Sequence, residues 1–372
     1  MSKQDVKEQQ LLLAETKFGL DLLRNQLKIN DDSFVFSLLS VSLALALVHS
    51  GAENQSKAEI EKVLLGGASN EDFVIHFSNL SKSLKTAENG TEVHVANRVY
   101  VNDKVQIESH YLSCVKENYD AAAELLDFVS TDSADKINSF IRESTQRKLD
   151  NLVSSESISD AVALLVNAVY FKGEWDDSFS PDSTADREFT TKAGEIKKIP
   201  FLTEIMCDRG YASDDIYQVL VLNYRDDKYK FAIFLPKEGN ELEDALRELD
   251  AHRFQKLLQA AKRTYMNTQF SKFTIRKEMT LKESLQSLGI TEIFTDQADL
   301  SGIAEGIKIS DGSHSALIEV NEEGTTAAAA TVIKAVPMCL RVEDPVDFNA
   351  NHPFLFALVK DNHPLFLGVF YG

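Results

Sequence analysis

The sequence predicts a single α+β domain, and three observations support this fold class. The chain of 372 residues contains no repeat, low-complexity tract or linker, and its 16 glycines and 7 prolines are scattered singly. Helical patterns fill the first third of the chain, whereas strand patterns appear between them and dominate its C-terminal part. Helices and strands do not alternate strictly, as they would around a parallel sheet. We therefore expect residues 1–372 to form one large domain.

The N-terminal third begins with a helix that has one apolar face, formed by Leu11, Ala14, Phe18 and Leu22. An uncharged run follows over residues 33–52, about as long as a membrane span. Its serines, histidine and glycine, and the lack of close basic residues, favour a buried strand end followed by a helix. Residues 93–101 are rich in valine and predict a buried strand.

Further along, a second apolar helical face is formed by Ile137, Ile141 and Leu149. Apolar runs at residues 219–222 and 231–235 flank a turn at Arg225-Asp226-Asp227 and predict a hairpin. Asn240, with Glu243 three positions later, indicates a capped amphipathic helix. Phe273 and Ile275 alternate with polar neighbours, as in a strand.

Composition and charge exclude several classes of protein. Apolar residues make up 44% and charged residues 26%, which rules out a disordered chain or a fibre. The formal charge of −19 makes nucleic acid and anionic membranes poor partners. The densest basic stretch, residues 142–148, has mixed charges and is interpreted as a solvated helix face.

The cysteines and the N-terminus indicate a reducing compartment. Cys114, Cys207 and Cys339 are widely separated and odd in number, so no disulfide framework is predicted. Residues 1–13 contain no apolar stretch long enough for a signal peptide. We expect a cytoplasmic protein, which could also enter the nucleus.

Signatures of catalysis are absent. The chain has no GxSxG, HExxH, Walker or GxGxxG motif, and its eight histidines show no metal-ligand spacing. We therefore expect no enzymatic activity, no metal and no cofactor.

One segment is unlike ordinary structure. Residues 322–339 read EEGTTAAAATVIKAVPMC, with four consecutive alanines between threonines and β-branched residues. As a strand, this stretch has small side chains on both faces and could enter between two existing strands without a clash. An exposed loop or a short helix is the alternative that the segment alone leaves open.

The chain resembles the serpin family along essentially its whole length. The motifs that carry the resemblance are NAVYFKGEW at 167–175, VANRVY at 95–100, Ile137-Asn138 with Thr145, Lys148 and Leu152, Phe348, HPFLF at 352–356, LFLG at 365–368, and the hinge at 322–330. The sequence departs from the family at Leu38 and at Tyr371-Gly372, where many members have proline, and at Thr326, where many have glutamate.

The resemblance implies three β-sheets, about nine helices and an exposed reactive-centre loop at about residues 322–345. It also implies a suicide mechanism: a protease cleaves the loop and forms an acyl-enzyme, and the loop then inserts as a strand into the central sheet. It assigns Trp175 to the breach, where the loop enters that sheet. The hinge residues are Glu322, Gly324, Thr325, Ala327, Ala328, Ala329 and Ala330, and a polar cluster that restrains sheet opening comprises Ser37, Ser40, Asn167 and His314.

The composition of the hinge favours an active inhibitor. Thr325, Ala327, Ala329 and Thr331 share one face by the two-residue period of a strand, and all are small and uncharged. We expect Thr325 to lie near the surface before cleavage and to be the first side chain to turn inward.

Loop length sets the specificity. In the family that this chain resembles, the cleaved bond lies a fixed distance beyond the hinge glutamate; the resemblance therefore implies cleavage at Met338-Cys339, and Met338 suits chymotrypsin-like or elastase-like serine proteases. A slipped register would present Leu340 or Arg341 instead, the latter to trypsin-like enzymes. The expected partner is a target serine protease bound covalently by a monomer. The alternatives are a non-inhibitory carrier or chaperone, and a cross-class inhibitor of cysteine proteases.

Overall fold

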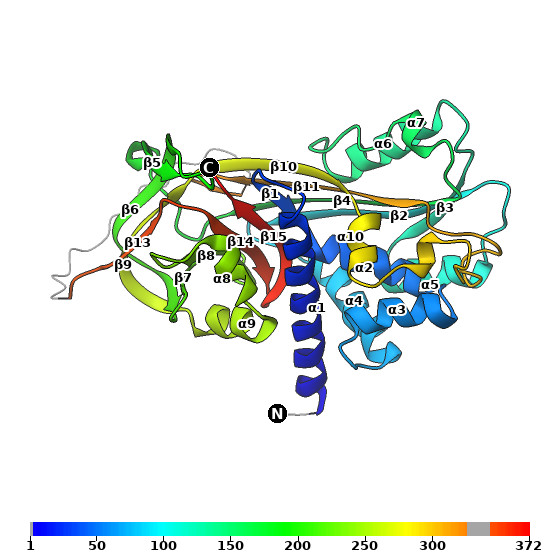
Figure 1. Ribbon diagram of the computed structural model, residues 1–372, viewed down its shortest axis with the longest axis horizontal. Coiled ribbons are helices and arrows are strands. Elements are labelled where there is room, and N and C mark those ends of the chain that lie inside the picture. The colour runs from blue at the N-terminus through cyan, green and yellow to red at the C-terminus, as the bar shows by residue number, and fades with distance from the viewer. Residues whose placement is uncertain (1–2, 326–342) are drawn as a thin grey trace.

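The computed structural model describes residues 3–325 and 343–372, with side chains from Val6 onward (Figure 1). Within these residues the helices are α1 Lys3–Leu27, α2 Leu38–His49, α3 Asn54–Leu64, α4 Asn70–Leu84, α5 Ser109–Tyr119, α6 Ser133–Ser144, α7 Ser155–Ile158, α8 Leu242–Arg247, α9 Ala251–Ala260 and α10 Lys282–Ser287, with 3₁₀ turns at Pro181–Ser183 and Glu292–Phe294. The strands are β1 Phe34–Phe36, β2 Glu92–Asn102, β3 Ala122–Leu126, β4 Ala163–Glu174, β5 Ala185–Thr190, β6 Ile196–Ser213, β7 Tyr217–Asn223, β8 Tyr229–Pro236, β9 Lys262–Ser271, β10 Phe273–Thr280, β11 Asp311–Val320, β12 Gly324–Thr325, β13 Val346–Ala350, β14 Phe354–Lys360 and β15 His363–Phe370. The predicted α+β class is confirmed.

The strands of the described residues form two hydrogen-bonded sheets. One has nine strands in the order β1-β15-β14-β8-β7-β6-β9-β13, with β5 also paired to β6. Three sheets were expected, but the long strand β6 pairs with β7 and β9 and bulges between Glu204 and Cys207. Two of the expected sheets are therefore joined through β6. The hairpin predicted around residues 225–227 is confirmed by β7 and β8.

The second sheet has six strands in the order β10-β11-β12-β4-β2-β3. Strands β4 and β11 are parallel and paired directly from Leu164 opposite Asp311 to Tyr170 opposite Leu317. We call this line of pairing between β4 and β11 the seam. At its far end, the short strand β12 lies between β4 and β11 and pairs with both strands. The seam between β4 and β11 is thus closed along most of its length and open at one end.

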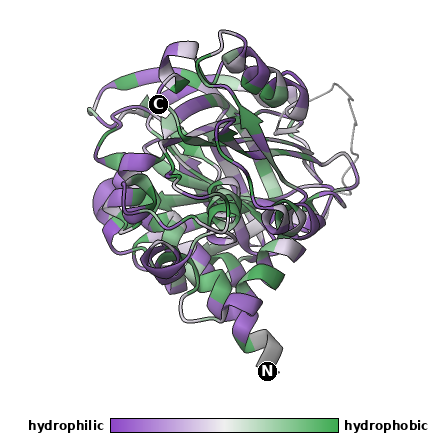
Figure 2. Cartoon of the chain, turned by 90° about the vertical axis from the view of Figure 1, so that its right-hand side faces the viewer, coloured by the Kyte–Doolittle hydropathy of each residue, from purple (hydrophilic) through white to green (hydrophobic). Residues whose placement is uncertain are grey.

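Helices cover both faces of the six-stranded sheet (Figure 1). On one face, α6 packs its apolar residues Ala134, Ile137 and Ile141 in one cluster with Leu164 and Val166 of β4. On the other face lie α2 and, around it, α3 to α5. Hydrophobic segments concentrate in the centre of the molecule and hydrophilic ones at its periphery (Figure 2).

The uncharged run at residues 33–52 forms β1 and α2, as its composition predicts. Every residue of α2 from Leu38 to His49 is buried, because this helix lies between the two sheets. Among the described helices, none is long and apolar enough to cross a membrane.

Two local predictions were wrong. Helix α6 ends at Ser144, so Leu149 does not extend its face; the Thr145 hydroxyl donates to the Ile141 carbonyl, and Gln146 and Arg147 adopt positive φ angles. Helix α8 has Glu241 at its N-cap without a side-chain hydrogen bond, and the Asn240 amide donates to the Lys237 carbonyl instead.

Candidate functional site

The hinge already occupies the open end of the seam. In β12, Gly324 pairs with Glu174 and Thr325 pairs with Gly173 on β4, while Thr325 also pairs with Val320 on β11. The backbones approach so closely that a Cβ atom on Gly324 would lie 1.9 Å from the Gly173 carbonyl oxygen. Only glycine fits at this point of the hinge.

Thr325 is fully buried, which corrects the expectation that it lies near the surface before cleavage. Its hydroxyl forms a 2.6 Å hydrogen bond with the Tyr224 hydroxyl. Gly173 makes room for this contact, because a Cβ atom there would lie 2.7 Å from the Tyr224 ring. Burial raises the pKa of Tyr224 well above its usual value, so the phenol stays neutral. Thr325 is therefore already paired and buried within the six-stranded sheet.

Trp175 holds the turn that leads from β11 into β12. Its indole N–H donates to the Asn321 carbonyl at 2.9 Å, and its backbone N–H donates to the Glu323 carbonyl at 2.8 Å. The buried indole stacks on Tyr224 with ring centroids 4.5 Å apart. The aromatic pair thus connects the breach to the Thr325 hydroxyl.

Glu322 is fixed by a cation and a hydroxyl. Its carboxylate accepts from Lys272 Nζ at 2.8 and 3.1 Å and from the Thr184 hydroxyl at 2.8 Å. Burial raises the pKa of Glu322, but the hydrogen bonds from Lys272 and Thr184 outweigh it and lower the pKa overall. The charged carboxylate anchors the first residue of the hinge.

The four residues of the polar cluster meet beneath the middle of the seam. His314 Nδ1 lies 2.5 Å from Asn167 Oδ1, and His314 Nε2 accepts from the Ser37 backbone N–H at 3.0 Å. The Asn167 amide donates to the Ser40 carbonyl at 2.6 Å, so Ser40 contributes its backbone; its hydroxyl has no hydrogen-bond partner among the described residues. The Ser37 hydroxyl donates to the Leu365 carbonyl.

These contacts fix the protonation of His314. Since Nε2 accepts a hydrogen bond, the proton lies on Nδ1 and is donated to Asn167. Burial lowers the pKa of His314 to about 3. A second proton would lie on Nε2 and point at the Ser37 N–H, which is also a donor. The ring must therefore stay neutral to keep this hydrogen bond.

The hydrogen bond between His314 and Asn167 crosses the seam. These residues are opposite each other in the register of β11 and β4. An inserted strand would separate β4 and β11 by about a further 4.8 Å. The side-chain bond between them must then break.

Three residues of this site were not singled out in the sequence: Tyr224, Lys272 and Asn97. Asn97 lies opposite Asn167 on β2 and accepts a hydrogen bond from its amide at 2.5 Å. Asn97 could have been found, because it lies within the quoted motif at residues 95–100. Tyr224 and Lys272 carry no such local signal. The expected hinge residues Ala327 to Ala330 and the bond Met338-Cys339 lie outside the described residues.

Comparisons with known proteins agree with this architecture. The family model "Serpin (serine protease inhibitor)" matches residues 13–372. The chain is 33% identical to Iripin-2 of Ixodes ricinus over 95% of its length and 90% of that protein. It is 34% identical to serine protease inhibitor 42Dd of Drosophila melanogaster, covering 91% of each. The crystal structure of the thermophilic serpin tengpin in the native state matches with a TM-score of 0.89 at 26% identity, covering 97% of this chain and 94% of that one.

The chain has an α+β fold in which β12 lies between β4 and β11 at the open end of their seam. The family model and the relatives identify its class: the chain belongs to the serpin family. The homologues support protease inhibition as the general function and a protease as the partner.

Proposed function

We propose that this protein is a suicide inhibitor of chymotrypsin-like or elastase-like serine proteases and has no catalytic activity of its own. A protease attacks the bond between Met338 and Cys339, an acyl-enzyme forms, and the loop inserts into the seam before the acyl bond is hydrolysed. The observation that carries this proposal is the hinge strand β12, which is paired with both walls of the seam.

The register of β12 defines the inserted strand. Gly324 faces Glu174 and Thr325 faces Gly173, so each later hinge residue would face one residue earlier on β4. Ala163, the first residue of β4, lies ten residues before Gly173. The residue ten positions after Thr325, Ala335, would therefore meet it. The loop between Thr325 and Ala335 matches the full length of β4.

Side-chain composition fits this register. Thr325 faces the core, so Ala327, Ala329 and Thr331 would face it too by the two-residue period of a strand. Lys334 is the only charged residue between positions 325 and 335. It falls on the opposite face, where its ammonium group could stay in water.

Pairing also favours insertion. Strands β4 and β11, on either side of the seam, are joined by one parallel ladder, and β12 is antiparallel to both strands. Full insertion would replace a parallel ladder with two antiparallel ladders, and antiparallel pairing is slightly more stable per residue. It would also bury the small apolar face of the strand.

Incubation with chymotrypsin tests the proposal. We expect a covalent complex that survives denaturing electrophoresis and a released C-terminal peptide that begins at Cys339. Cleavage without a stable complex would indicate a non-inhibitory serpin, whereas cleavage after Leu340 or Arg341 would contradict the assigned bond. Trypsin and papain serve as specificity controls, because neither is expected to be trapped efficiently.

The state and location of the protein are part of the proposal. We propose that the inhibitor acts as a monomer in the cytoplasm; the free thiols of Cys114 and Cys207 are compatible with that reducing compartment. Sedimentation and thiol titration of the protein isolated from its native cells test both points. A dimer, or thiols blocked in disulfides, would contradict them.

A further inference from the structure

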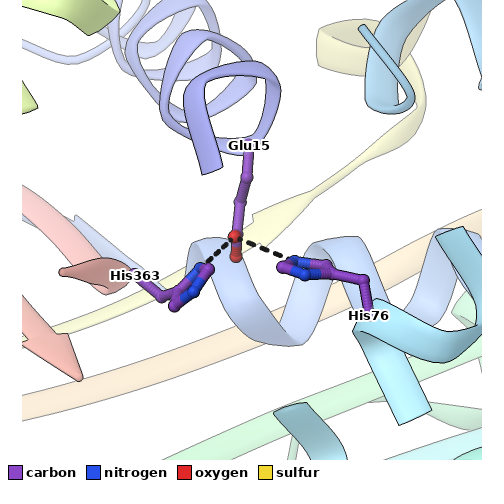
Figure 3. Close-up of side chains that lie close together, drawn as sticks. All are labelled: Glu15, His76 and His363. Atoms are coloured by element: carbon purple, nitrogen blue, oxygen red, sulfur yellow. Dashed lines mark hydrogen bonds and ion pairs between the residues drawn. The ribbon is translucent and has the colours of Figure 1, made fainter. Parts of the chain in front are cut away.

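Three side chains from distant parts of the sequence converge in one cluster (Figure 3). Glu15 lies on α1, His76 on α4 and His363 at the start of β15. Glu15 Oε2 is 2.9 Å from His363 Nδ1 and 3.5 Å from His76 Nε2. One ligand atom from each residue lies within 4.8 Å of the other two. The histidines that show no metal-ligand spacing in the sequence are thus brought together by the fold.

The cluster has unmet bonding capacity. The Glu15 side chain is only 1% exposed, and its Oε1 has no hydrogen-bond partner among the described residues. His76 Nε2 also has none within that part of the chain. Burial raises the pKa of Glu15, but His363 and His76 outweigh it and lower the pKa to about 2. Within the part of the chain that the structure describes, the ion-pair partners of this buried carboxylate are the two imidazole rings.

We propose that Glu15, His76 and His363 bind a divalent transition metal ion, Zn²⁺ being the best match. Two histidine nitrogens and one carboxylate oxygen, with water as the fourth ligand, are an established donor set for zinc. Bonds of about 2.0–2.2 Å in a tetrahedron place ligand atoms about 3.3 Å apart. The two distances to Glu15 bracket this value, and the rings need to approach each other by about 1.5 Å at most.

A second layer of contacts holds two of the ligands in place. Gln255 of α9 donates to the Thr16 hydroxyl at 2.8 Å and to the Asn362 carbonyl at 3.0 Å. Thr16 follows Glu15 and Asn362 precedes His363, so one amide fixes the backbone beside both ligands. Such outer partners orient the ligands of metal sites.

The cluster is accessible to an ion. A cleft of about 260 Å³ reaches His76 and His363. Its charged lining residues are Lys7, Glu8, Asp72, Lys360 and Asp361. Lys7 is paired with Asp72 at 2.9 Å and Lys360 with Asp361 at 3.0 Å, so neither lysine leaves an uncompensated charge at the entrance. The cleft also has room for the water ligand.

Binding has a defined proton balance. The metal replaces the hydrogen bond between His363 Nδ1 and Glu15. In the neutral ring the proton then sits on Nε2, so that Nδ1 is free to bind the metal. This site is independent of the proposed protease inhibition, because it shares no residue with the hinge or with the polar cluster beneath the seam.

Titration of the full-length protein with Zn²⁺ and Co²⁺ tests the site, with the thiols alkylated beforehand to exclude cysteine ligation. We expect Zn²⁺ to raise the melting temperature in a concentration-dependent way that EDTA reverses. Co²⁺ should give the absorption of a tetrahedral site. Mg²⁺ should not compete, because it prefers oxygen ligands.

Matched variants locate the ion. His76→Gln and His363→Gln should each weaken zinc binding by at least about tenfold. His110→Gln, which changes an exposed histidine on α5, should leave it unchanged. If one cluster variant does not fold, the other gives the answer. No zinc binding by the wild type, or equal affinity in the cluster and control variants, would overturn the proposal.

Discussion

His314 illustrates how a single side chain can restrain a strand rearrangement. Its ring lies beneath the seam, joined on one side to Asn167 of β4 and on the other to the Ser37 backbone. Both bonds need the neutral ring, because one nitrogen donates and the other accepts. The residue therefore couples the state of the seam to protonation.

This coupling predicts a pH dependence of stability. The pKa of His314 is about 3 in the folded protein against an ordinary value of 6.5, so between these values the unfolded chain binds a proton that the folded one does not. The free energy of unfolding should fall as the pH drops below 6.5, by up to about 1.4 kcal/mol per pH unit. Denaturant unfolding between pH 4.5 and 7 measures the slope.

His314→Gln is the control for this slope. The variant cannot titrate, so its stability should depend less on pH over the same window than that of the wild type. The pKa of Glu15 is lowered to about 2 in the folded protein. Its contribution to the free energy of unfolding is therefore lost only below its ordinary pKa of 4.5, which lies outside this window. Equal slopes in the two proteins would assign the pH dependence to other groups.

Met338 carries the prediction of specificity at the residue scale. Met338→Arg should change the target from chymotrypsin to trypsin, because the trypsin pocket holds a carboxylate that pairs with arginine. Rates of covalent complex formation with both enzymes measure the switch. If the variant traps chymotrypsin at an undiminished rate and ignores trypsin, then Met338 does not occupy the primary pocket.

At the scale of elements, β12 shows how a two-residue strand joins two neighbouring strands. Thr325 pairs with both β4 and β11, Gly324 pairs with β4, and the Thr325 hydroxyl contacts that of Tyr224. The alternation that buries Thr325 would expose Thr326 on the opposite face of the sheet. The same substitution should therefore impair insertion at Thr325 and leave it unimpaired at Thr326.

Thr325→Arg should convert the protein from an inhibitor into a substrate. A buried unpaired guanidinium costs several kcal/mol, so insertion should slow by orders of magnitude and the acyl-enzyme should hydrolyse first. The intact variant should also melt at a lower temperature, since Thr325 is already buried. The stoichiometry of inhibition and a thermal melt measure the two effects.

Thr326→Arg is the matched control, with the same side chain one residue later. Its guanidinium would point to solvent after insertion, so near-stoichiometric trapping should persist. Trapping by both variants would mean that insertion through β12 does not carry inhibition, and loss in both would mean that the assigned faces are wrong.

At the scale of the whole molecule, strands β4 and β11 are joined in parallel over the same residues that an inserted strand would pair with on both sides. In the proposed mechanism, cleavage of the loop releases one of its ends, and the released segment inserts between these two strands.

The cleaved wild type should therefore melt at a higher temperature than the intact protein. The added strand would supply two antiparallel ladders and bury its small side chains. Calorimetry before and after limited cleavage in the loop measures the shift, and cleaved Thr325→Arg should gain much less. Equal melting temperatures of intact and cleaved wild type would contradict a strand-accepting sheet.

The sequence by itself determined the features that follow from local periodicity and composition. The apolar face of α1, the buried run in β1 and α2, the β7–β8 hairpin and the small residues of the hinge are all visible in neighbouring residues. Where local signals competed, as at Asn240 and Leu149, the prediction failed: Asn240 donates to the Lys237 carbonyl instead of capping the helix, and α6 ends at Ser144, before Leu149.

Only the tertiary structure decided which of these features meet. The burial of Thr325 against Tyr224 depends on the register of β12 with two other strands. The bond between His314 and Asn167 depends on a parallel pairing of β11 and β4, and the cluster of Glu15, His76 and His363 depends on the packing of two helices against a hairpin. No local pattern specifies such contacts, since the residues lie far apart in the chain and their alignment is fixed by packing of the whole core.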